Sequence, residues 1–139
     1  MEPVYTRSSN QIAITELGPT QEVQIVSPTT QRIAQLNDAF RKGDPSVPGQ
    51  RIATAGVLHL LSQLDIPVEQ LILRVAQFDD FAEHNDPHGE HDFGAFEFHG
   101  EQIFWKVDCY YHDYALGSDD PTDLSKTRRV LTIMLAHEW

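Results

Sequence analysis

Three histidines and four carboxylates lie close together in the middle of the chain, between His84 and Glu97. Imidazole and carboxylate groups are the ligands that zinc and other divalent transition metals commonly take from proteins. One hypothesis is therefore a divalent metal site, for example for zinc. The candidate metal ligands are His84, Asp86, His88 and His91.

The spacing of these residues does not follow a standard metal-binding signature. His84 and His88 would share one face of a helix, but Pro87 and Gly89 interrupt helical structure there. The run from His88 to His91 is one residue shorter than the inverted zincin motif. The alternative is a structural loop between a helix and a hairpin, in which Asp and Asn side chains cap turns and histidines satisfy backbone groups.

The same stretch offers groups for acid–base chemistry without a metal. A general acid or base needs a carboxylate or an imidazole whose pKa is shifted in a cleft, and neighbouring acids raise one another's pKa. The candidate catalytic residues are Glu90, His91 and Asp108, although no nucleophile or oxyanion hole is evident. If the stretch does bind a metal, as in the first hypothesis, the function that it predicts is a metal-dependent hydrolase centred on residues 84–92. This is one functional hypothesis.

The formal net charge of −11 indicates a different function. Thirteen Asp and Glu residues lie between Asp79 and Asp123, where the only Lys or Arg is Lys106. Such a field repels nucleic acid and suits a protein partner with a basic surface. The leading hypothesis is thus a non-enzymatic protein-binding module that needs no cofactor. The candidate binding residues are Asp79, Asp80, Asp86, Glu90, Asp92, Asp119 and Asp120.

Length and composition predict one folded domain. The chain has 139 residues, of which 40% are hydrophobic, and no apolar run approaches the roughly 18 residues of a membrane span. The first residues lack the basic and apolar regions of a signal peptide, and Cys109 is the only cysteine, so we expect a cytoplasmic protein. We expect an arm over residues 1–26 and a single domain over 27–139, with the oligomeric state left open.

Sequence patterns predict the elements that must position these residues. A helix starts at Ser27-Pro28 and ends at Gly43, because Ser suits an N-cap and Gly a helix end. Residues 51–58 are expected to form a strand, although Ala53, Ala55 and Leu58 would suit a helix too. Residues 65–78 are expected to form a second helix and residues 125–139 a third.

The clearest local signal is a hairpin of residues 93–98 and 101–111 around the turn His99-Gly100. Its register would pair Phe96 with Ile103 and Gly94 with Trp105. We therefore predict an α+β fold, with a small, mainly antiparallel sheet made of hairpin 92–111 plus one or two further strands. About three helices would pack on it.

Several segments resemble a bacterial family of unknown function, DUF3768. They are residues 36–41 (Leu-Asn-Asp-Ala-Phe-Arg), 78–81 (Phe-Asp-Asp-Phe), 85–94, 104–108 (Phe-Trp-Lys-Val-Asp) and 127–136. The resemblance implies a compact intracellular bacterial domain that travels with mobile elements, and it carries no catalytic residues with it. An inhibitor of host defence, such as an anti-restriction or anti-CRISPR-like protein, is one concrete version of the binding module.

Overall fold

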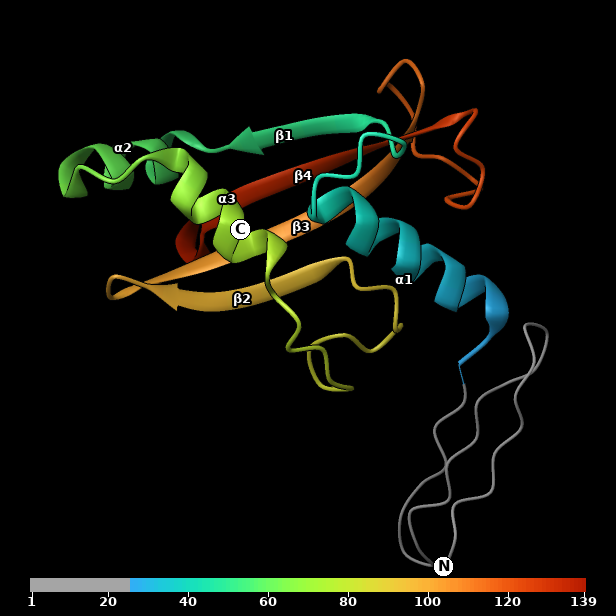
Figure 1. Ribbon diagram of the computed structural model, residues 1–139, viewed down its shortest axis with the longest axis horizontal. Helices are drawn as coiled ribbons and strands as arrows, with labels where there is room; N and C mark the ends of the chain where they lie inside the picture. The colour runs from blue at the N-terminus through green and yellow to red at the C-terminus, as the bar shows by residue number, and fades with distance from the viewer. Residues whose placement is uncertain (1–25) are drawn as a thin grey trace, which may run out of the picture.

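The computed structural model describes residues 26–139, which form a four-stranded sheet with three α-helices (Figure 1). The helices are α1 (Pro28–Arg41), α2 (Ala55–Leu64) and α3 (Val68–Ala76), and a 3-10 turn, η1 (Ala136–Glu138), follows the last strand. The strands are β1 (Gly49–Ala53), β2 (Phe93–Phe98), β3 (Glu101–Tyr111) and β4 (Thr127–Leu135). The predicted α+β class is confirmed, whereas the predicted arm falls, except for Val26, outside the described residues.

The sheet has the strand order β1-β4-β3-β2. β2, β3 and β4 are antiparallel neighbours, and β1 pairs with β4 in parallel, so the hairpin gains the two further strands that the fold prediction allowed. His99 and Gly100 both have positive φ (50° and 84°), as a tight two-residue hairpin turn requires. The predicted register is also confirmed: Phe96 pairs with Ile103, and Gly94 with Trp105.

One face of the sheet carries the core. Ile103, Trp105 and Val107 alternate along β3 with more exposed residues, as expected for a strand that is buried on one side. Helices α1 and α3 lie across this face (Figure 1). They contribute Leu36 and Phe40 from α1 and Leu71 and Val75 from α3 to the same cluster. Gly94 has no side chain, so the Trp105 ring can rest directly on the β2 backbone.

The first helix matches its prediction. The Ser27 side chain accepts a hydrogen bond from the backbone N–H of Thr30 (3.1 Å), Pro28 occupies the first helical turn, and Gly43 follows the end with φ 94°. The helix predicted for residues 65–78 is α3, but it is shorter than expected. Asp65 adopts a left-handed conformation (φ 56°) at the end of α2, and Pro67 becomes the N-cap of α3.

The strand predicted for residues 51–58 is only half correct. The chain is extended to Ala53, and Thr54 then begins α2 by accepting the N–H of Val57 at its hydroxyl (3.4 Å). Ser, Thr and Asp are favoured at this position because their side chains satisfy a free N–H of the first turn. The prediction therefore missed a helix whose Val57 and Leu61 are buried.

The helix predicted for residues 125–139 is wrong, because residues 127–135 form β4, the strand between β1 and β3. Both faces of this central strand are covered, so its apolar residues follow one another without alternating. A continuous apolar run of this kind does not distinguish a buried strand from a helix. Arg128 and Arg129 consequently belong to a strand start and not to a helix N-terminus.

Candidate functional site

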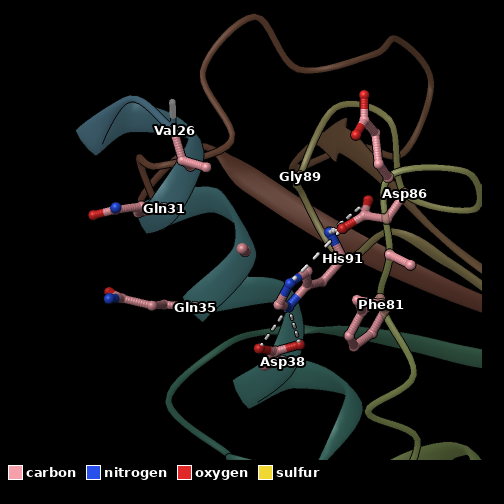
Figure 2. Close-up of a pocket in the computed structure, with 11 residues that line it drawn as sticks. Val26, Gln31, Gln35, Asp38, Phe81, Asp86, Gly89 and His91 are labelled. Atoms are coloured by element: carbon pink, nitrogen blue, oxygen red, sulfur yellow. Dashed lines mark hydrogen bonds and ion pairs between the residues drawn. The ribbon is translucent and has the colours of Figure 1, made fainter. Parts of the chain in front are cut away.

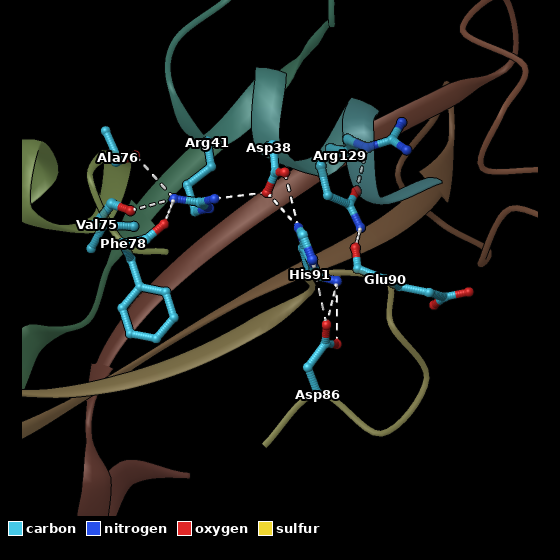
Figure 3. A network of polar contacts seen from close by, with 10 residues as sticks. Asp38, Arg41, Val75, Ala76, Phe78, Asp86, Glu90, His91 and Arg129 are labelled. Atoms are coloured by element: carbon cyan, nitrogen blue, oxygen red, sulfur yellow. Dashed lines mark hydrogen bonds and ion pairs between the residues drawn. The ribbon is translucent and has the colours of Figure 1, made fainter. Parts of the chain in front are cut away.

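A buried guanidinium connects α1 to the end of α3. The side chain of Arg41 is 1% exposed, and its Nη1 atom donates to the carbonyl oxygens of Val75 (2.8 Å), Ala76 (3.0 Å) and Phe78 (2.9 Å), as Figure 3 shows. Val75 and Ala76 are the last residues of α3 and Phe78 follows its C-cap, a place where backbone acceptors lack helical partners and the helix dipole favours a cation. Arg41 therefore fixes where α3 ends and where the following loop begins.

Asp38, one helical turn before Arg41, joins this cation to His91. Its carboxylate lies 2.8 Å from Nη2 of Arg41, and its two oxygens lie 3.0 and 2.9 Å from Nδ1 of His91 (Figure 3). A carboxylate held by a guanidinium is ionised and can only accept hydrogen bonds. Nδ1 of His91 therefore carries a proton, which leaves Nε2 as the ring atom open to other contacts.

Two further contacts hold His91 in place. Its ring is stacked on Phe81, with a centroid distance of 3.9 Å and an interplanar angle of 3°. Its backbone has positive φ (55°), an uncommon conformation for a residue other than glycine, and its N–H donates to both carboxylate oxygens of Asp86 (3.2 and 3.3 Å). The side chains of Asp38 and Asp86 thus lie on either side of His91 (Figure 2).

Asn37 extends the network to the sheet. Its amide nitrogen donates to the carbonyl of Glu90 (2.9 Å), and its amide oxygen accepts from Nε of Arg129 on β4 (2.7 Å). Nη2 of Arg129 in turn donates to the carbonyl of Pro121 (2.8 Å). Side chains of α1 therefore hold the segment between α3 and β2, residues 77–92, against the rest of the domain. We call this segment the acidic loop.

A pocket of about 390 Å³ lies between α1 and the acidic loop (Figure 2). Its lining comes from α1, from the residue just before the N-cap of α1, and from the acidic loop. The lining residues are Val26, Gln31, Ala34, Gln35, Asp38, Phe81, Ala82, Glu83, Asp86, Gly89 and His91. Three of these side chains are carboxylates, and none is Lys or Arg. The pocket therefore combines an aromatic and aliphatic wall with negative charge.

The predicted metal ligands do not converge. His84 and His88 are exposed on the acidic loop, whereas Asp86 is buried and His91 turns toward α1. Of the four, Asp86 and His91 approach each other, with Oδ2 and Nε2 3.7 Å apart. Among residues 26–139, no three His, Cys, Asp or Glu side chains are placed to hold a metal ion together.

The three candidate catalytic residues are distributed over different surroundings. His91 lines the pocket beside α1, whereas Asp108 lies on the opposite face of the sheet, 3.2 Å from the ammonium group of Lys106. Asp108 shares a second pocket with Asp92 and Trp139. Burial, with a smaller contribution from Asp92, raises the pKa of Glu90, whose backbone carbonyl is held by Asn37. The three residues therefore do not line one common pocket.

The candidate binding residues divide into two groups. Asp79 and Asp80 are exposed on the acidic loop, where Asp86 is buried and Glu90 and Asp92 are half-buried. Asp119 and Asp120 belong to the loop between β3 and β4, at another edge of the domain (Figure 1).

Both residues of the second group already have partners, although Asp119 is exposed. Asp119 pairs with Lys126 (3.4 Å). Asp120 closes a turn by accepting the N–H (3.1 Å) and hydroxyl (2.6 Å) of Thr122.

Sequence reasoning missed the α1 half of this site, formed by Asn37, Asp38 and Arg41. A signal was present, because Asn37 and Arg41 follow Ile33 at intervals of four residues and so continue the apolar side of the helix. Each is 2% exposed. A polar residue on the buried side of a helix indicates a hydrogen-bonded partner, which here comes from distant segments.

The fold and site define a small α+β domain in which an acidic loop is held against a helix by a buried polar network. A family model described as "Protein of unknown function (DUF3768)" matches residues 53–138, and the chain belongs to this family. The match includes Phe81, Asp86 and His91 but begins after α1, so it does not include Asp38 and Arg41. No curated protein and no solved structure matches the chain. Within residues 26–139, no helix is both long and apolar enough to cross a membrane.

Proposed function

We propose that this protein is a non-enzymatic binding module that holds a basic surface of a protein partner with its acidic loop. One observation carries the proposal: the loop is fixed by α1 while its outer carboxylates stay exposed. The loop contains Asp79, Asp80, Glu83, Asp86, Glu90 and Asp92 and no Lys or Arg. Asp79, Asp80 and Glu83 are exposed.

Fixing the loop matters because ordering a flexible segment on binding costs free energy. A loop of this length without regular structure is uncommon in a compact domain unless it has a function or is held by other contacts. Here Arg41 fixes its beginning, and Asn37 and Asp38 fix Glu90 and His91 near its end. Exposed carboxylates on such a loop steer a basic partner and set its orientation.

The class of partner that this arrangement suits is a protein with a phosphate-binding groove. Enzymes that handle nucleic acid present such basic grooves, and carboxylates can occupy them in place of phosphates. A defence enzyme of this kind, in an anti-restriction or anti-CRISPR-like interaction in the bacterial cytoplasm, is the concrete version that we propose. The net charge of −11 supports it.

The test compares charge reversals in two places. The double variant Asp79→Lys/Asp80→Lys changes the acidic loop, and Glu69→Lys/Glu101→Lys makes the same change in charge at exposed positions on α3 and β3. Quantitative mass spectrometry would measure the proteins from a lysate of the source organism that each variant retains at low and high salt.

We expect salt-sensitive partners of the native protein to be lost from the first variant and kept by the second. Equal retention by the two variants would contradict the proposal, as would a set of partners insensitive to salt. Asp119→Lys tests the β3–β4 loop separately and is expected to keep the partners, since that carboxylate is already paired with Lys126.

A further inference from the structure

We propose that the pocket between α1 and the acidic loop receives an arginine side chain of the protein partner. This inference rests on the proposed function and names the group that the module recognises. It is carried by three features of the pocket: two acceptors placed for one donor group, a buried carboxylate with few partners, and an aromatic and aliphatic wall.

The two acceptors are Nε2 of His91 and Oδ2 of Asp86, which are 3.7 Å apart. This distance is too long for a direct hydrogen bond. In the tautomer whose Nδ1 proton Asp38 accepts, Nε2 of His91 carries a lone pair. A planar group with several N–H donors, placed between the two atoms, can donate to both of them.

Asp86 is the second feature. Its side chain is 5% exposed and lines the pocket. Among residues 26–139, the only N–H that its carboxylate accepts is the backbone N–H of His91, at 3.2 and 3.3 Å. An ionised carboxylate can accept about four hydrogen bonds, and one that is buried is stabilised by a cationic donor. Asp86 therefore favours a positively charged ligand.

The remaining walls select among cations. Phe81, Ala34 and Ala82 provide apolar contacts, and the exposed Glu83 adds a third carboxylate to Asp38 and Asp86. A guanidinium is planar, weakly hydrated and binds carboxylates through two parallel hydrogen bonds, whereas an ammonium is compact and strongly hydrated. The volume of about 390 Å³ is within the range of small-ligand pockets. Arginine fits these walls better than lysine.

The experiment titrates the full-length, ¹⁵N-labelled protein with three blocked tripeptides, Gly-X-Gly, in which X is arginine, lysine or citrulline. Citrulline has nearly the shape of arginine without its charge. We expect the arginine peptide to shift the amide signals of Phe81 and Gly89 and the ring signals of His91. The lysine peptide should bind more weakly, and the citrulline peptide at least about tenfold more weakly.

Two variants of the pocket and one control complete the design. Asp86→Asn should weaken the arginine peptide about tenfold, and Glu83→Gln, which alters an exposed side chain and leaves the fold intact, about two- to fivefold. Asp119→Asn removes one carboxylate from the other loop and should change nothing. The Glu83 variant keeps the test valid if Asp86→Asn disturbs the loop.

Three results would overturn the inference. The first is equal binding of the arginine and citrulline peptides, or of the arginine and lysine peptides. The second is unchanged binding in the Glu83 variant. The third is ¹⁵N evidence that both ring nitrogens of His91 are protonated at neutral pH, since Nε2 could not then accept. Loss of partner retention in Asp79→Lys/Asp80→Lys together with any of these results would leave the acidic-loop function standing and remove only the arginine pocket.

Discussion

Arg41 illustrates how one side chain can determine the position of a functional segment. Its guanidinium donates to two carbonyls in the last turn of α3, to one just after it and to Asp38, and it lies over the rings of Trp105 (4.9 Å) and Phe81 (5.4 Å). Lysine could supply the charge but neither the planar stacking nor donors on two separate nitrogens. The ability of Arg41 to hold this segment in position therefore depends on the shape of its side chain as well as on its charge.

We expect Arg41→Lys to lower the free energy of unfolding by about 2–3 kcal/mol, because buried carbonyls and the Asp38 carboxylate would lose their donors. Urea denaturation would measure this effect. Arg32→Lys, on the exposed side of the same helix, is the matched control and should change stability by less than about 0.5 kcal/mol. Equal effects of the two substitutions would show that Arg41 acts through charge alone.

The residue types of the acidic loop were predictable, but their partners were not. The sequence shows that His91 and Asp86 belong to a turn-rich loop, and both lie in the pocket. Asp38, which binds the His91 ring, is 53 positions away from His91. Pairings over such distances depend on how elements pack, and a single sequence has no local pattern that records them.

At the scale of elements, local signals were reliable and non-local ones were not. The β2–β3 hairpin follows from alternation and from a two-residue turn, both of which are contained in adjacent residues. β4 is a strand because β1 and β3 lie on either side of it, and neither neighbour is adjacent to it in sequence. The boundary between β1 and α2 depends on one residue, Thr54.

Glu138 links two elements and gives them a pH dependence. Its carboxylate accepts the hydroxyl of Thr54 (2.6 Å) and the N–H groups of Leu135 (2.8 Å) and Gly56 (3.2 Å), so η1 is tied to the start of α2. The Thr54 hydroxyl, followed by the Leu135 N–H, lowers the pKa of Glu138 below its ordinary value of 4.5. A lowered pKa in the folded state contributes stability above the unfolded pKa, and this contribution is lost as pH falls through the folded pKa.

We therefore expect Glu138→Gln to melt at a lower temperature than the native protein at pH 7, with a difference that shrinks steadily below about pH 4.5. Thermal unfolding followed by circular dichroism at several pH values would measure it. Glu101→Gln, at an exposed position of β3, should show no such dependence. A difference that stays constant from pH 7 to pH 3.5 would contradict the role assigned to the ionised carboxylate.

At the scale of the whole molecule, a net charge of −11 on 139 residues opposes folding through repulsion among its carboxylates. Salt shortens the range of this repulsion, from about 30 Å at 10 mM to about 8 Å at 150 mM. We expect the melting temperature, measured by scanning calorimetry, to rise over this range of NaCl.

The Glu69→Lys/Glu101→Lys variant provides a control for this prediction. Each substitution changes the charge by +2, so the net charge becomes −11 + 4 = −7. The melting temperature of this variant should therefore rise less with salt than that of the native protein. A melting temperature that falls with salt in the native protein would show that favourable ion pairs, such as Asp119–Lys126, outweigh the repulsion.

The strand order β1-β4-β3-β2 has a consequence for the time at which this domain can fold during its synthesis. β4 leaves the ribosome after β1, β2 and β3, yet it is the strand that joins β1 to the hairpin. Until residue 135 has emerged, β1 lacks its partner β4, and β3 exposes the edge that β4 will cover. Exposed strand edges of this kind favour aggregation. The nascent chain therefore depends on rapid completion of β4, or on a chaperone, to protect its apolar sheet.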